Sequence, residues 1–210
     1  MEATELCIIM DECGSDKGKK DINKSWHNYT LVYYNLFKEI KNNNLRVFEL
    51  GLGTNNVNMP SNMGANGKPG ASLYGWARFF PNANIYGADI DYDILFQTDR
   101  IKTYYCDQLN PVDIKTMWSN VELWEPFDII IEDGLHEYKA NVSFFENSIH
   151  KLKRGGFYII EDINANMLPL WEEKIQEWKI IYPELNFKLV RIPNTNNNWD
   201  NNLLIVKYNI

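Results

Sequence analysis

The chain has 210 residues, 45% of them hydrophobic, and a formal net charge of −7. This length suits one domain with a full core, no apolar run approaches the roughly 18 residues that span a bilayer, and the acidic balance without a basic stripe disfavours a nucleic-acid partner. No basic region precedes an apolar stretch at the N-terminus, and the three cysteines (Cys7, Cys13, Cys106) are odd in number, so we expect free thiols and a cytoplasmic location.

Apolar periodicity predicts helices and strands that alternate along most of the chain. Pro81 ends one helix and Pro111 opens another, while Gly155 and Gly156 are expected to cap the helix before them. In chain order we predict helix 30–41, strand 45–50, loop 51–70, helix 71–80, strands 84–88 and 101–106, helix 111–119, strand 127–132, helix 138–153, strand 157–161, helix 168–181, and strands 187–192 and 203–208.

This order predicts an α/β fold with a Rossmann-like sheet of seven mostly parallel strands, the last one antiparallel, and helices on both faces. The connection between the final two strands, residues 193–202, is too short for a crossover helix, so these strands are expected to pair antiparallel. Its asparagine-rich stretch 194–202 is expected to be an exposed loop. We expect a single domain over residues 1–210.

Acidic residues end three of the predicted strands. The sequences at these ends are Glu49-Leu-Gly-Leu-Gly53, Glu132-Asp133 and Glu161-Asp162. Because the carboxyl ends of parallel strands meet at one edge of the sheet, these side chains are expected to lie close together. That edge is where open α/β sheets bind their ligands.

The same edge is predicted to bind a nucleotide-type cofactor. Gly51 and Gly53 let the backbone approach a ligand closely, and Glu49 can accept a hydrogen bond from an amine or hydroxyl. No third glycine follows Gly53, so the pyrophosphate cradle of a dinucleotide site is missing. This pattern fits a cofactor without a pyrophosphate, such as S-adenosylmethionine. Further candidates end the next two strands: Asp89 and Asp91 near a ribose, and Asp107 and Gln108 near an adenine.

Together these motifs resemble class I S-adenosylmethionine-dependent methyltransferases, above all the branch that O-methylates sugars in macrolide, aminocoumarin and surface-glycan pathways. The unit Asp133-Gly-Leu-His136, followed by the acidic end of the next strand, is the most specific part. The other segments that carry the resemblance are Cys13-Gly-Ser-Asp-Lys-Gly18, His27-Asn-Tyr-Thr30, Val47-Phe-Glu-Leu-Gly-Leu-Gly-Thr54, Gly67-Lys-Pro-Gly-Ala-Ser72, Ile85-Tyr-Gly-Ala-Asp-Ile-Asp91, Cys106-Asp-Gln108 and Gly155-Gly156.

The resemblance implies a role for each position. Residues 1–44 would supply helices and a lid over a core of residues 45–210. The implied cofactor contacts are Glu49, Gly51 and Gly53 to the methionine part, Asp89 (with Asp91 less favoured) to the ribose, Asp107 and Gln108 to the adenine, and the lid residues Asp16, Lys17, His27 and Tyr29 over the site.

Methyl transfer to a hydroxyl needs the removal of a proton, either by a base or with the help of a metal ion. Asp133, Glu161 and Asp162 supply oxygen ligands from adjacent strand ends, which suit Mg²⁺, with Ca²⁺ or Mn²⁺ as alternatives. In the resembling sugar methyltransferases the matching acids hold a divalent ion that binds neighbouring sugar hydroxyls. His136 is our preferred base, and Asp133 is the alternative.

The expected function is therefore O-methylation of a sugar. The acceptor would be a nucleotide-activated hexose or heptose for capsule or lipopolysaccharide, or a glycosylated natural product. A catechol-type O-methyltransferase is a near alternative, but Asp-Asn would then directly follow the strand, and here the order is Glu161-Asp162-Ile163-Asn164. An NAD-dependent sugar oxidoreductase or epimerase lacks support from the glycine pattern, and a non-catalytic methyltransferase-fold subunit stays open. The Trp-rich helix 168–181 suggests a homo-oligomer.

Overall fold

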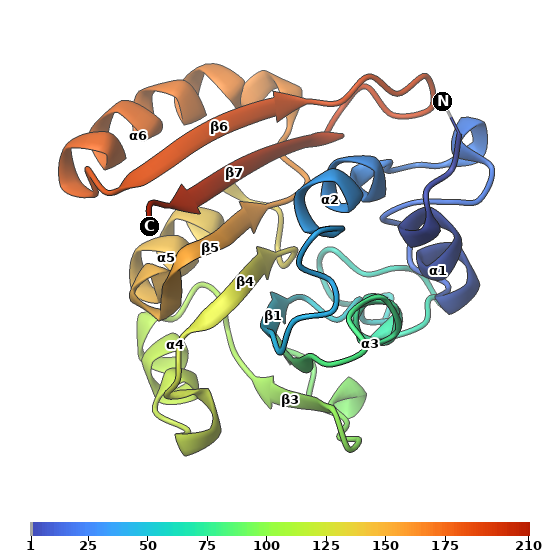
Figure 1. Cartoon of the computed structure of the whole chain (residues 1–210), viewed down its shortest axis with the longest axis horizontal. Coiled ribbons are helices and arrows are strands. Elements are labelled where there is room, and N and C mark those ends of the chain that lie inside the picture. Colours follow the sequence, from blue (N-terminus) through green and yellow to red (C-terminus); the bar gives the residue numbers. More distant parts are fainter. Residues whose placement is uncertain (1) are drawn as a thin grey trace.

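The strands form one seven-stranded sheet in the computed structural model, which describes residues 2–210 (Figure 1). The strand order is β3-β2-β1-β4-β5-β7-β6. β7 runs antiparallel to both β5 and β6, and the other pairs are parallel. The predicted Rossmann-like sheet is thus confirmed. The strands are β1 (Arg46–Leu50), β2 (Asn84–Asp89), β3 (Ile101–Tyr105), β4 (Phe127–Glu132), β5 (Leu152–Ile160), β6 (Leu185–Arg191) and β7 (Asn202–Tyr208).

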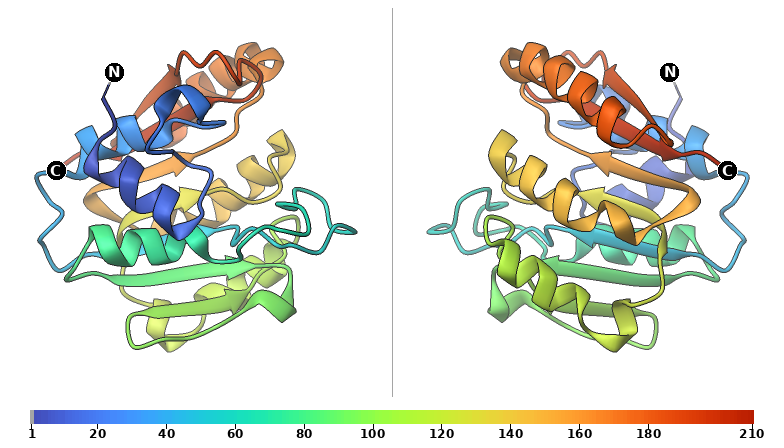
Figure 2. Two further views of the ribbon diagram at one scale, coloured as in Figure 1. Left: turned by 90° about the vertical axis from the view of Figure 1, so that its right-hand side faces the viewer. Right: turned by 90° about the vertical axis from the view of Figure 1, so that its left-hand side faces the viewer.

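Helices cover both faces of the sheet (Figure 2). One face carries α1 (Glu5–Cys13), α2 (Tyr29–Phe37) and α3 (Ala71–Phe79), and the other carries α4 (Pro111–Trp118), α5 (Tyr138–Ser148) and α6 (Leu168–Ile181). Because side chains alternate along a strand, neighbouring residues of β1 enter opposite cores: Val47 packs with the first layer and Phe48 with the second. Within residues 2–210 no helix is long and apolar enough to cross a bilayer.

The N-terminal residues form part of the core. Helix α1, which the sequence analysis did not single out, is capped by the Thr4 side chain and ends at Gly14 in the left-handed conformation. Leu6 and Met10 of α1 are fully buried against α2 and α3. This packing accounts for the position of residues 15–28, which run on from α1 across the edge of the sheet. Whether residues 1–44 move as a lid stays a prediction.

The helix predicted over residues 138–153 is too long. α5 ends at Ser148, a short 3₁₀ turn follows, and β5 begins at Leu152, which pairs with Phe127 of β4. The next parallel pair joins Ile129 and Phe157, so the intervening residues of β5 bulge out of the ladder. Gly155 and Gly156 lie in this bulge and do not cap a helix. The helix has already ended at Ser148, and Leu152 pairs with a strand. The helix predicted over residues 30–41 also ends early, at Phe37.

The order in which strands are added to the sheet reverses at β1. The chain passes from β1 to β2 and β3 on one side, and then to β4 and β5 on the other. This switch point opens a crevice at the carboxyl ends of β1 and β4. Gly51 follows β1 directly with φ +90°, and its N–H donates to the Ala88 carbonyl at 2.8 Å. A Cβ atom added there would lie 1.8 Å from the Asp133 carbonyl oxygen.

This close approach predicts that Gly51→Ala destabilises the protein by more than its backbone conformation alone explains. The left-handed conformation costs an alanine about 1–2 kcal/mol, and the clash with Asp133 adds to that cost. Gly64 is the matched control, because it has φ +73° and no atom within 4 Å of an added Cβ. Urea unfolding should show a loss for Gly51→Ala at least about 1 kcal/mol larger than for Gly64→Ala. Equal losses would contradict the proposed close approach.

Candidate active site

A cleft of about 420 Å³ lies at the carboxyl ends of the central strands. Most of the residues predicted from the sequence line it. They are Asp16, Lys17, Gly51, Gly53, Asp89, Asp107, Gln108, Asp133, His136 and Asp162. Four predicted residues lie outside the lining: Glu49, Asp91, Tyr29 and Glu161. His27 and Asp200 also line the cleft, and Asp200 was not anticipated.

The glycine loop after β1 is held by acidic side chains. Asp89 accepts hydrogen bonds from the backbone N–H groups of Leu52 (2.7 Å) and Asp91 (2.9 Å), and burial raises its pKa. Asp91 accepts from the Thr54 hydroxyl at 2.5 Å. Asp91 is therefore a loop anchor outside the cleft, whereas Asp89 both shapes the loop and faces the cleft. The role of Asp89 at a ribose stays a prediction.

Glu49 lies beneath the cleft rather than in it. Its carboxylate is fully buried and accepts hydrogen bonds from Ser72 and Trp76 of helix α3. Burial raises the pKa of Glu49, while Lys17 and these donors oppose the rise. The contact between Glu49 and the methionine part of the cofactor stays a prediction.

Asp107 and Gln108 lie at the end predicted to take the adenine. The Gln108 side chain donates to Glu132 at 2.5 Å and accepts from the backbone N–H of Leu135 at 2.8 Å. It thereby joins the end of β3 to the loop that carries His136. Burial raises the pKa of Glu132 to about 7, and this strand-end acid was not among the predicted site residues.

Lys17 is the fixed cation of the site. Its side chain is 2% exposed, and its Nζ atom lies 2.5 Å from Asp133, 2.6 Å from Glu161 and 3.7 Å from Glu49. Burial disfavours the ammonium form, but the three carboxylates outweigh burial and raise the pKa of Lys17 well above its usual value. Lys17 therefore binds the carboxylates of β1, β4 and β5 rather than only facing a cofactor.

Glu161 and Asp162 point in different directions from the end of β5. Glu161 is buried and accepts from Lys17 at 2.6 Å and from the Tyr33 hydroxyl at 2.5 Å. It does not line the cleft. Lys17 and Tyr33 hold Glu161 in this arrangement, and its role as a metal ligand stays a prediction. Asp162 does line the cleft, and the Tyr29 hydroxyl donates to it at 2.7 Å. Tyr29 lies outside the cleft lining and orients the Asp162 carboxylate through this hydrogen bond.

His136 stands between two carboxylates in the cleft. Its Nε2 atom is 3.1 Å from Asp133 Oδ1 and 3.2 Å from Asp162 Oδ2. Burial disfavours the imidazolium, but Asp162 and Asp133 outweigh burial and raise the pKa of His136 to about 10. Both His136 (φ +60°) and Asp162 (φ +53°) adopt the left-handed backbone conformation. Such strain in residues other than glycine is typical of functional sites.

Among residues 2–210, two groups of side chains have ligand atoms close enough to hold a metal ion. Asp133, His136 and Asp162 form one, and their ligand atoms lie within 4.8 Å of one another. Two carboxylates that line a cleft suit a divalent cation, so Asp133 and Asp162 fit the predicted ion. The second group, His27, Asp162 and Asp200, shares Asp162 with the first.

The asparagine-rich loop between β6 and β7 is a structural clamp. Its amide side chains donate to backbone carbonyls of the segment before α2: Asn194 binds Trp26 at 2.7 Å, and Asn196 binds Asn23 at 2.6 Å. The loop also places Asp200 in the cleft. The expected exposed loop is confirmed for residues 195, 196, 198 and 199, whereas Asn197, Asn201 and Asn202 are buried. The amide contacts join two irregular segments that have no backbone pairing in a sheet.

Comparison with known proteins identifies relatives of this chain. Similar curated sequences are 8-demethyl-8-alpha-L-rhamnosyl tetracenomycin-C 2'-O-methyltransferase from Streptomyces olivaceus (28% identity, 70% of this chain and 36% of that protein) and demethylmacrocin O-methyltransferase from Streptomyces fradiae (30%, 71% and 38%). Mycinamicin VI 2''-O-methyltransferase from Micromonospora griseorubida is 32% identical over 65% of this chain and 32% of its own length. The chain spans about a third of the length of the curated relatives it matches. No protein-family model matches it.

A solved structure shares the fold. The MycE methyltransferase of mycinamycin biosynthesis, in complex with Mg, SAH and mycinamycin VI, superposes with a TM-score of 0.73 at 23% identity and covers 98% of this chain and 55% of that one. The fold is therefore that of a class I methyltransferase. The resemblance to sugar O-methyltransferases that the motifs indicated is confirmed by the curated relatives.

The cluster around Lys17 predicts a strong loss of stability in Lys17→Met. Removing one partner of a buried ionic cluster costs about 3–5 kcal/mol, because Glu49, Asp133 and Glu161 then lack their cation. Without Lys17, the folded protein binds these carboxyl protons more tightly than the unfolded chain does. Its stability should therefore rise as the pH falls from 8 to 5.

Urea unfolding of four proteins measures this effect: the wild type, Lys17→Met, Glu161→Gln and the double variant. The double variant should be more stable than Lys17→Met, since it buries one carboxylate fewer. If the stability loss of the double variant equals the sum of the losses of the two single variants, Lys17 and Glu161 do not interact.

Proposed function

Since the chain is a homologue of sugar O-methyltransferases and has the class I methyltransferase fold, we propose that it transfers a methyl group from S-adenosylmethionine to a sugar hydroxyl. The observation that carries this proposal is the arrangement of Asp133, His136 and Asp162 around one cleft at the switch point of the sheet. The glycine loop and Asp89 lie at the same cleft and are proposed to hold the cofactor.

The acceptor we propose is a sugar already attached to a larger molecule. The names of the relatives describe a rhamnosyl tetracenomycin, an olivosyl-oleandolide and mycinamicin VI, which are glycosylated natural products. A nucleotide-activated sugar for a surface polysaccharide, which the sequence analysis also considered, is the other acceptor to screen. The homo-oligomer and the cytoplasmic location stay predictions.

In the proposed reaction the sulfur–methyl bond breaks as the acceptor oxygen bonds to the methyl carbon, and the hydroxyl proton passes to His136 Nε2. Asp133 and Asp162 would hold a divalent cation, which supplies positive charge that lowers the pKa of a nearby hydroxyl. Carboxylates bound to such a cation would favour the imidazolium less, and a neutral His136 would accept the proton. Burial favours protonated Asp133, but Lys17 and His136 outweigh it and lower the pKa of Asp133 well below its usual value. Asp133 is therefore the weaker base.

Calorimetric titration with S-adenosylhomocysteine tests the cofactor assignment. We expect micromolar binding, and no binding of NAD under the same conditions. A screen of glycosides and nucleotide sugars with labelled S-adenosylmethionine then tests the transfer, which should require Mg²⁺ and stop in EDTA. Full activity in EDTA would remove the metal from the proposal, and failure to bind S-adenosylhomocysteine would favour a non-catalytic subunit.

His136→Gln should slow turnover by about 10²–10⁴-fold, since general-base catalysis contributes that much. The affinity for S-adenosylhomocysteine should stay within a few-fold, because His136 is proposed to act on the acceptor. His150→Gln is the matched control, as His150 is exposed on a turn after α5. Turnover at the wild-type rate in His136→Gln would assign the base to another group, with Asp133 as the next candidate.

A further inference from the structure

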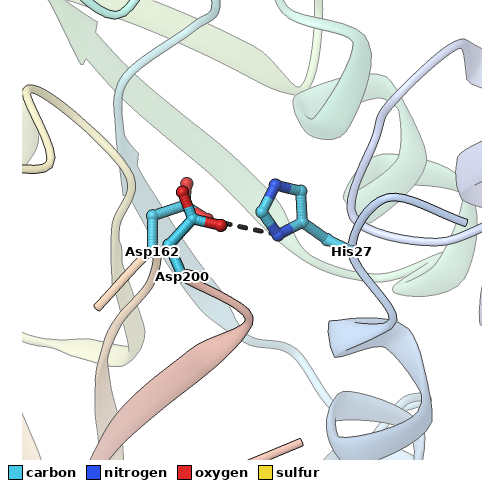
Figure 3. Close-up of side chains that lie close together, drawn as sticks. All are labelled: His27, Asp162 and Asp200. Carbon is cyan, nitrogen blue, oxygen red and sulfur yellow. Dashed lines mark ion pairs between the residues drawn. The ribbon is translucent and has the colours of Figure 1, made fainter. Parts of the chain in front are cut away.

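Three side chains from distant parts of the sequence, His27, Asp162 and Asp200, lie close together (Figure 3). His27 comes from the segment before α2, Asp162 follows β5, and Asp200 lies in the loop between β6 and β7. All three line the cleft, and one ligand atom of each lies within 4.8 Å of the others. The proposed methyl transfer gives His27 and Asp200 no role.

The ring of His27 is buried and aimed at the two carboxylates. The residue is 5% exposed, and its Nδ1 atom is 3.3 Å from Asp162 Oδ1. This contact is not aligned as a hydrogen bond, and among residues 2–210 the Nδ1 atom has no hydrogen-bond partner. A buried polar atom without a partner costs free energy. Its position toward Asp162 and Asp200 therefore points to a ligand between them.

The charges around these residues call for a cation. Within the described residues, Asp162 has ion-pair contacts only with His27 and His136, and Asp200 has none. The nearby ammonium of Lys17 is taken up by Asp133 and Glu161. Two carboxylates that share a cleft without a lysine or arginine partner are stabilised by a bound cation.

Neighbouring groups already hold both carboxylates in place. The Tyr29 hydroxyl lies 2.7 Å from Asp162 Oδ1 and 3.0 Å from the backbone carbonyl of Asp200. The Asn197 amide donates to Asp200 Oδ1 at 2.6 Å. Such outer contacts orient ligands at metal sites, and here they join the lid segment, β5 and the clamp loop at one point.

We propose that His27, Asp162 and Asp200 form a second divalent-cation site, beside the one at Asp133 and Asp162, with Asp162 shared by both. One imidazole and two carboxylates suit Mn²⁺ or Zn²⁺ better than Mg²⁺, which prefers an all-oxygen shell. A cation there ties the segment before α2 and the β6–β7 loop to the end of β5. The site does not rest on the proposed methyl transfer, since binding of the metal alone defines it.

Counting bound Mn²⁺ by electron paramagnetic resonance tests this site. The wild type should bind two Mn²⁺ ions, whereas Asp200→Asn and His27→Gln should each retain one and bind the second at least about tenfold more weakly. Matched controls are Asp99→Asn and His150→Gln, which make the same chemical changes at exposed positions and should still bind two. One ion in the wild type, or two in Asp200→Asn with wild-type affinities, would overturn the proposal.

A measurement on the unaltered protein guards against misfolded variants. The chain has only three histidines, so their imidazole resonances can be assigned one by one in nuclear magnetic resonance spectra. Diamagnetic Zn²⁺ should shift the resonance of the His27 ring nitrogen that binds it, and leave the ring nitrogens of His150 unchanged. No change at the ring nitrogens of His27, up to saturation with Zn²⁺, would overturn the second site. In folded Asp200→Asn, confirmed by circular dichroism, the change at His27 should appear only at higher Zn²⁺ concentrations.

Discussion

The ammonium group of Lys17 is the interaction on which the site depends. The parallel sheet brings the ends of β1, β4 and β5 to one edge, and this topology forces Glu49, Asp133 and Glu161 together. Like charges at such short range, out of contact with water, would oppose folding. Lys17, which is not part of the sheet, offsets this repulsion because its ammonium group contacts all three carboxylates. The packing of α1 and α2 fixes the N-terminal segment that carries Lys17.

The cation also divides the acidic residues into two levels. Glu49 and Glu161 lie beneath the cleft, where they are buried and bound by side chains of the α1–α3 layer. Asp133 contacts Lys17 with one oxygen and His136 with the other, so it reaches both levels. Asp162 faces the cleft because its left-handed backbone turns it away from the direction of Glu161. The lower level gives rigidity, and the upper level is left to bind ligands.

The sequence predicted the sheet and the edge that carries the site, because strand periodicity and strand-end acids are local signals. It could not predict that Asp162 lines the cleft while Glu161 lies beneath it. This difference arises from the left-handed backbone at Asp162 and from the hydrogen bond that Tyr33 of a distant helix donates to Glu161. Asp200 was missed for a similar reason: the clamp that positions it consists of amide contacts across more than 160 residues. Gly155 and Gly156 were misplaced because a bulged strand start and a helix cap use the same residue type.

Charge balance connects these features to function. Lys17 binds Glu49, Glu161 and one oxygen of Asp133. Among residues 2–210, Asp162 has only the imidazoles of His27 and His136 as ion-pair partners, and Asp200 has none. His136 holds its proton tightly, because Asp162 and Asp133 raise its pKa to about 10. A protonated imidazole cannot act as a base. A site that needs neutral His136 near pH 7 therefore needs another source of positive charge, and divalent cations at the shared carboxylate Asp162 would supply it.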